Sequence, residues 1–317
     1  MDAPVNLQTE LAPRHKSGLT LKNPVMTAAG TFGYGVEYAR IAEIRRLGAI
    51  ICKGTTRHAR KGNEHPRTVE TASGMLNAIG LQNPGVRAVI RKYAPTWKGW
   101  QTPVIVNIAG ETIEEFVQIA ELLEGVEGVA GIEVNVSCPN IRAGGVVFGA
   151  DPQAVADVTA AVRKATTLPL IVKLSPNSGD TRPTAVAAAS SGADAISLIN
   201  TFTALRIDIA ARRPVLANVT GGLSGPAIKP LALRMVYEVA KELRSNYAHI
   251  PIIGIGGICN ASDALEFLMA GASAIEVGTM NFVNPRAGVE ILEGIEAFLR
   301  AEGIGDVKEI IGAALPE

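Results

Sequence analysis

Hydrophobic residues recur along the chain in eight short runs rich in Val, Ile and Ala. These runs cover residues 24–30, 49–56, 104–110, 131–139, 170–176, 195–201, 250–257 and 274–279. Stretches with the apolar spacing of amphipathic helices lie between or after most of them, at 37–47, 113–123, 152–165, 183–191, 227–243, 262–270 and 285–301. Short strands that alternate with helices predict βαβ units and a parallel sheet. Eight such units predict an α/β protein whose single domain is a closed (β/α)8 TIM barrel.

The alternative architecture is an open, doubly wound sheet. Gly254-Ile-Gly-Gly257 resembles the start of a dinucleotide-binding fingerprint, but Cys259 stands at the sixth position and no second half follows. The barrel is therefore the preferred prediction.

Two connections, 56–86 and 202–226, are longer than ordinary loops and are rich in glycine, proline or charged residues. Both leave the carboxyl end of a predicted strand, so we expect them to form inserted loops that roof an active site there. Residues 1–16 are predicted to be a polar N-terminal extension, and residues 17–317 the barrel domain.

Composition narrows the choice of partners. The formal net charge is zero, which gives no sign of a surface for nucleic acid. No apolar run is long enough for a membrane span, and the first residues lack the apolar core of a signal peptide. The three cysteines are far apart and odd in number, which favours a reducing cytoplasm over a disulfide scaffold. Three thiols are also too few for a typical iron–sulfur cluster, and no metal site is expected.

The stretch from Gly131 to Asn140 carries the most distinctive chemistry. Ile132, Val134 and Val136 alternate as in a strand, and Pro139 ends the pattern because it has no N–H to donate. Asn135 and Cys138 then fall at a strand's carboxyl end, where β/α proteins place their chemistry. Cys138 is a candidate acid–base group; the plainer alternative is a small buried hydrophobic residue.

Several other strand ends carry lysines and amides. The lysines are Lys53 and Lys173, and the amides are Asn107, Asn135 and Asn200. Gly54 follows Lys53, and Thr201 follows Asn200. The four histidines lie in loops or at strand starts, so a histidine base is not expected. Cations and amides suit a flat, polar, electron-accepting ring, because an ammonium group can stabilise its anionic reduced form.

The last two strand ends are glycine-rich instead. Gly256 and Gly257 are followed by the helix opening at Asn260, and Gly278-Thr279 ends the final run. Such loops allow close backbone approach and are the usual phosphate site of a barrel. A redox ring beside a phosphate predicts flavin mononucleotide (FMN).

These motifs together resemble the class 1 dihydroorotate dehydrogenases over essentially the whole chain. The matching segments are residues 77–85 (NAIGLQNPG), 135–140 (NVSCPN), 199–201 (INT) and 221–227 (GGLSGPA), with Gly256-Gly257 and Gly278-Thr279. Segments 77–85 and 221–227 resemble the B-type catalytic subunit, which works with an iron–sulfur flavoprotein and passes electrons to NAD. Class 2 members carry serine at the position of Cys138.

The resemblance implies a set of site residues. FMN contacts would be Ala29, Gly30, Lys53, Gly54, Asn107, Asn135, Lys173, Ile199, Gly225, Gly256, Gly257, Gly278 and Thr279. Substrate contacts would be Lys53, Asn77, Ala78, Ile79, Gly80, Leu81, Asn135, Asn200 and Thr201. Gly54 replaces a more common alanine or threonine, and Ala204-Leu205 replaces Gly-Met.

The implied reaction is the oxidation of (S)-dihydroorotate to orotate in pyrimidine biosynthesis. Cys138 would remove the C5 proton and FMN would take the C6 hydride, with Lys53 and Lys173 as further catalytic residues. The implied assembly is a homodimer within a heterotetramer that contains an FAD/2Fe-2S electron-transfer subunit. Alternatives are an FMN-dependent dihydropyrimidine or dihydrouridine oxidoreductase, a Schiff-base aldolase using Lys173, and a non-catalytic scaffold.

Overall fold

A computed structural model describes residues 5–137, 142–143 and 146–316 of the chain. Eight parallel strands close into a barrel in the order β11-β12-β17-β18-β3-β4-β7-β8. Their bounds are Val25–Thr27 (β3), Ala49–Ile51 (β4), Val104–Ile108 (β7), Gly131–Asn135 (β8), Leu170–Lys173 (β11), Ala195–Leu198 (β12), Ile252–Ile255 (β17) and Ala274–Val277 (β18). Each strand lies within one of the eight predicted runs, so the TIM barrel is confirmed.

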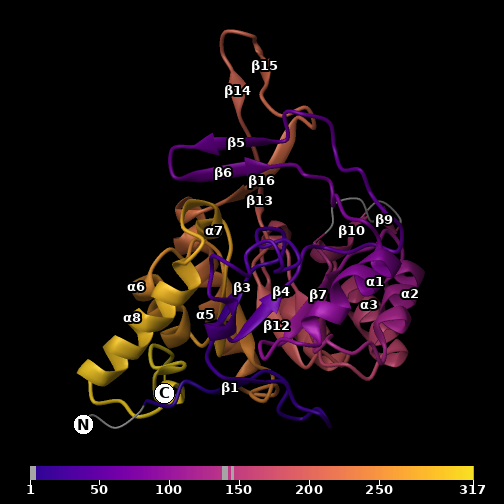
Figure 1. Cartoon of the computed structure of the whole chain (residues 1–317). Coiled ribbons are helices and arrows are strands. Elements are labelled where there is room, and N and C mark those ends of the chain that lie inside the picture. The colour runs from indigo at the N-terminus through magenta and orange to yellow at the C-terminus, as the bar shows by residue number, and fades with distance from the viewer. Residues whose placement is uncertain (1–4, 138–141, 144–145, 317) are drawn as a thin grey trace.

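Helices cover the outside of the barrel (Figure 1). They are Val86–Trp97 (α1), Ile113–Leu123 (α2), Pro152–Ala165 (α3), Arg182–Ser190 (α4), Lys229–Leu243 (α5), Ala261–Met269 (α6), Met280–Val283 (α7) and Ala287–Ala301 (α8). Short 3₁₀ helices lie at Ile44–Arg46 (η1), Phe148–Ala150 (η2), Pro176–Ser178 (η3), Pro226–Ile228 (η4) and Val307–Ile310 (η5). No helix in the described ranges is long and apolar enough to cross a membrane.

One helix prediction was wrong, and the helix α1 was not predicted. Residues 37–47 form successive turns, and only η1 is helical there. Phe32 stacks on Tyr38 with ring centroids 4.2 Å apart, and Glu43 adopts a left-handed φ of 45°, so aromatic packing and a tight turn replace the expected helix. Conversely, α1 was missed, although its buried residues Val86, Val89, Tyr93 and Trp97 have helical spacing.

The barrel interior has an apolar layer at the amino ends of the strands. Met26, Ile105, Ile171 and Ile253 point into it, together with Leu11 from the N-terminal segment. That segment forms a small hairpin in which Thr9–Glu10 (β1) pairs with Thr20–Leu21 (β2). Leu11 is fully buried, so residues near the N-terminus close the bottom of the barrel.

The two long connections meet above the opposite end of the barrel (Figure 1). They contribute Thr68–Thr71 (β5), Gly74–Asn77 (β6), Phe202–Leu205 (β13) and Thr220–Ser224 (β16), which form one antiparallel sheet in the order β13-β16-β6-β5. The predicted roof is therefore a four-stranded sheet rather than loops. A hairpin of Ile207–Asp208 (β14) and Arg213–Pro214 (β15) projects away from the barrel (Figure 1). Two further short strands, Arg142–Ala143 (β9) and Val146–Val147 (β10), pair with each other.

Candidate active site

A polar cluster fills the upper part of the barrel interior. The Lys173 ammonium at the end of β11 donates a 3.2 Å hydrogen bond to Glu276 Oε2 on β18 and lies 3.9 Å from Glu133 Oε2 on β8. Asn107 Nδ2 on β7 donates to Glu133 Oε2 at 2.5 Å, and Ser197 Oγ on β12 donates to Glu133 Oε1 at 2.7 Å. Five strands thus hold one buried cation, which we call the Lys173 cluster (residues 107, 133, 173, 197 and 276).

Burial and charge act on this cluster in opposite directions. Burial lowers the pKa of Lys173, but the carboxyls of Glu133 and Glu276 outweigh it, so the pKa is raised and the ammonium stays charged. Burial and the neighbouring Glu133 raise the pKa of Glu276 well above its usual range, with Lys173 opposing them. Lys173 is therefore a fixed ammonium group below the barrel mouth, with two carboxyls beside it.

Amides form the next layer toward the roof. Asn200 Nδ2 donates to Asn135 Oδ1 at 3.2 Å, and the Ser137 backbone N–H donates to the same oxygen at 3.1 Å. Thr201 follows Asn200 and closely approaches β16, where a Cβ on Gly222 would lie 2.0 Å from Thr201 Oγ1. The predicted residues Asn135, Asn200 and Thr201 are therefore brought together under the roof sheet.

The strand end at β4 supplies a second cation. Lys53 is half-buried, and burial, followed by the nearby Arg67 guanidinium, lowers its pKa. Gly54 packs between the Lys173 cluster and the segment that follows β6. A Cβ there would be 3.2 Å from Asn107 Oδ1 and 3.3 Å from Leu81 Cδ2. Gly54, next to Lys53 in the chain, therefore lies close to both Asn107 and Leu81.

The segment from Asn77 to Leu81 begins at the last residue of β6 in the roof sheet. Hydrogen bonds to its backbone carbonyls hold it in place. Asn63 Nδ2 donates to the Ala78 carbonyl at 2.9 Å, and the Asn63 N–H donates to the Ile79 carbonyl at 3.0 Å. Gly80 and Leu81 both have positive φ, 74° and 55°. Asn77 Nδ2 donates to the Gly222 carbonyl at 3.4 Å, which ties this segment to β16.

The predicted phosphate residues gather on the other side of the mouth. A Cβ on Gly256 (φ 128°) would lie 2.8 Å from Ala232 Cβ and 3.6 Å from Ile199 Cγ1, so only glycine fits there. Gly257 is equally close to the backbone of Lys229. Thr279 Oγ1 donates to Ser224 Oγ at 2.8 Å, next to Gly225, and a Cβ on Gly278 would lie 3.5 Å from Ala28 Cβ, beside Ala29 and Gly30.

The family model for "Dihydroorotate dehydrogenase" matches residues 13–299. The chain belongs to the dihydroorotate dehydrogenase family. Among curated relatives, "Dihydroorotate dehydrogenase B (NAD(+)), catalytic subunit" of Geotalea daltonii is 55% identical over 94% of this chain and 96% of its own length. The proteins of the same name from Geotalea uraniireducens and Desulforamulus reducens are each 54% identical, over 94% and 93% of this chain and 96% of their own lengths.

Not every residue predicted from the family motifs can be placed. Cys138, together with Asn140, lies outside the described residues. The other two cysteines differ from a reactive base. Burial raises the pKa of Cys52 to about 12, and burial also raises the pKa of Cys259.

Three cluster members were not predicted: Glu133, Ser197 and Glu276. The strand alternation contained the signal. On β8, Ile132 and Val134 pack against the outer helices, so Glu133 between them must point into the barrel. Glu276 lies in the same way between Ile275 and Val277. Acidic residues at inward-facing positions of barrel strands indicate a buried polar cluster, because an unpaired buried carboxylate is costly.

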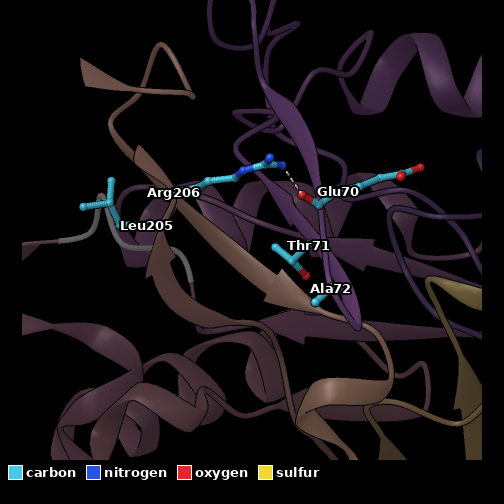
Figure 2. Close-up of a pocket in the computed structure, with 5 residues that line it drawn as sticks. All are labelled: Glu70, Thr71, Ala72, Leu205 and Arg206. Atoms are coloured by element: carbon cyan, nitrogen blue, oxygen red, sulfur yellow. Dashed lines mark hydrogen bonds between the residues drawn. The ribbon is translucent and has the colours of Figure 1, made fainter. Parts of the chain in front are cut away.

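A separate hollow of about 490 Å³ lies on the roof sheet, beside β5 and the end of β13, rather than in the barrel (Figure 2). It is lined by Glu70, Thr71, Ala72, Leu205 and Arg206, and Arg206 Nη1 donates to the Glu70 carbonyl at 2.6 Å (Figure 2). None of the predicted site residues lines it. Within the described part of the chain, no group of three or more His, Cys, Asp or Glu residues could hold a metal ion.

Proposed function

We propose that the chain is an FMN-dependent dihydroorotate dehydrogenase that oxidises (S)-dihydroorotate to orotate in pyrimidine biosynthesis. The observation that carries the proposal is the pairing of a fixed ammonium, Lys173, with amides on one side of the mouth and a glycine cradle on the other. Family membership and relatives named as the catalytic subunit of an NAD(+)-linked enzyme support the same reaction.

The residues at the mouth fit FMN in two respects. Asn107 Oδ1 is buried and has no hydrogen-bond partner in the described ranges, so it can accept from an N–H of a ring above it. Gly256 and Gly257 pack closely on Ala232 and Lys229 and carry no side chain of their own, so their backbone can be approached closely by a phosphate from the other side. We propose that Lys173, Asn107 and Asn135 hold the ring, while Gly225, Gly256, Gly257, Gly278 and Thr279 border the phosphate.

The proposed chemistry divides between cofactor and protein. FMN supplies the acceptor for the hydride that leaves C6 of the substrate. Cys138, as the thiolate, takes the C5 proton, Lys53 pairs with the substrate carboxylate, and Asn135, Asn200 and Thr201 bind the pyrimidine ring. The roof sheet excludes water from the reacting atoms.

The base assignment is tested by anaerobic stopped-flow reduction of the bound flavin. The wild-type flavin should bleach with dihydroorotate, and Cys138→Ala should bind orotate but bleach at least 100-fold more slowly, in keeping with general-base contributions of about 10²–10⁴. Cys259→Ala is the matched control and should keep the wild-type rate. Full activity in the Cys138 variant would refute the role. Faster bleaching with dihydrouracil than with dihydroorotate would instead favour a dihydropyrimidine oxidoreductase.

We also propose a cytoplasmic homodimer joined by an FAD/2Fe-2S electron-transfer subunit. The support is that the relatives are named as catalytic subunits, and that this sequence has three cysteines, one fewer than a cluster usually needs. The purified chain should therefore reduce a soluble dye with dihydroorotate but not NAD. Efficient NAD reduction by the chain alone would exclude the partner requirement without affecting the proposed substrate.

A further inference from the structure

The Lys173 cluster contains an imbalance of charge. Glu133 and Glu276 are both fully buried, and Lys173 is 5% exposed. The other members, Asn107 and Ser197, are neutral. Two ionised carboxylates beside one ammonium would leave a net negative charge in the barrel interior, which is strongly unfavourable in a medium of low polarity.

Hydrogen-bond donors are distributed unequally between the two carboxyls. Both oxygens of Glu133 accept hydrogen bonds, from Ser197 and Asn107, and Lys173 lies nearby. Glu276 accepts only from Lys173 at Oε2, and its Oε1 is buried with no hydrogen-bond partner in the ranges that the structure describes. Both carboxyls face the same ammonium, since Lys173 Nζ lies 3.2 Å from Glu276 Oε2 and 3.9 Å from Glu133 Oε2. More hydrogen-bond donors surround Glu133 than Glu276, so a negative charge is better stabilised on Glu133.

We propose that the two carboxyls keep one proton between them, with Glu133 ionised and Glu276 a neutral acid whose O–H donates to Glu133. This arrangement makes the cluster neutral overall and satisfies one more oxygen of the pair. The raised pKa of Glu276, caused first by burial and then by Glu133, agrees with it. Lys53 at the rim belongs to a separate strand end and is not needed for the balance.

The consequence for function is that Glu133 and Glu276 are positioning residues for Lys173. One ionised carboxylate is enough to keep the Lys173 amine protonated. A second ionised carboxylate would leave excess negative charge beside it and weaken the interaction of the ammonium with a ring bound above it. This second step rests on the proposed function, whereas the shared proton does not.

The shared proton can be detected by infrared spectroscopy of the purified chain near pH 8, where exposed carboxyls are ionised. The wild type should show the C=O stretch of a protonated carboxylic acid. Glu276→Gln removes the acid itself, and Glu133→Gln forces Glu276 to ionise as the only counter-charge of Lys173, so both variants should lose the band. Glu302→Gln, at an exposed position, should retain it.

Two results would overturn this proposal. Absence of the band from the wild type would mean that both carboxyls are ionised, and its persistence in Glu133→Gln would mean that the proton on Glu276 is independent of the pair. These measurements need only the single variants and no bound flavin.

The positioning role is tested by a double-mutant cycle on the dissociation constant of FMN. Each single variant keeps one counter-charge and should bind FMN within about fivefold of wild type, whereas Glu133→Gln combined with Glu276→Gln leaves Lys173 unpaired. The double variant should lose at least tenfold more affinity than the product of the single effects. Purely additive losses would reject the positioning role, and wild-type protein that does not bind FMN would refute the proposed function while leaving the infrared result intact.

Discussion

At the scale of single residues, Lys53 offers a test of substrate recognition by pH. Burial and the nearby Arg67 lower its pKa, so it loses its charge at a lower pH than an exposed lysine, whose pKa is about 10.4. If Lys53 pairs with the carboxylate of orotate, the affinity for orotate should fall as the pH rises toward that value. Titration of the bound flavin's absorbance with orotate at a series of pH values measures this.

Lys53→Arg is the matched control, because a guanidinium stays protonated throughout that range. Its orotate affinity should be nearly independent of pH, even if the absolute affinity is reduced by altered geometry. Identical pH profiles for the wild type and this variant would show that another group controls the titration.

At the scale of elements, the turn after β17 decides whether the phosphate side of the mouth can form. Gly256→Ala places a Cβ 2.8 Å from Ala232 Cβ on α5 at a φ of 128°, which should destabilise the fold by about 1–3 kcal/mol. We expect FMN affinity to fall at least tenfold, because β17 and α5 must separate next to the phosphate. Thermal unfolding and flavin fluorescence measure the two effects.

Gly303→Ala separates backbone strain from the effect on the site. Gly303 also has a positive φ, 70°, but nothing lies within 4 Å of the added Cβ, and it follows α8. This variant should lose about 1–2 kcal/mol of stability and keep wild-type FMN affinity. Equal loss of affinity in both variants would mean that the turn at Gly256 has no specific role.

At the scale of the whole molecule, the barrel interior has two layers: an apolar layer that contributes to stability and a polar layer that carries the proposed chemistry. Leu11 belongs to the apolar layer at the bottom, and the Lys173 cluster occupies the top. Leu11→Ala should lower the free energy of unfolding by about 2–5 kcal/mol, yet leave the rate of flavin reduction by dihydroorotate within about twofold. Denaturant unfolding and stopped-flow absorbance test this, and a large loss of rate in the folded variant would show that the two layers are coupled.

The amino-acid sequence alone located the barrel strands, because eight short β-branched runs alternate with helical patterns and this alternation is typical of a parallel sheet. It also placed Lys53, Asn107, Asn135 and Lys173 at strand ends, where parallel strands bring them to one rim. It failed at 37–47, where stacking of Phe32 on Tyr38 replaced the locally favoured helix.

Only the tertiary structure decided which polar groups meet across the barrel. Lys173 and Glu276 are 103 positions apart and lie on strands that are not neighbours, so no local pattern pairs them. Closure of the sheet brings their inward-facing side chains together. Once they are buried, the cost of an unpaired charge requires the ammonium and the carboxyls to satisfy one another, and this requirement exists only in the closed barrel.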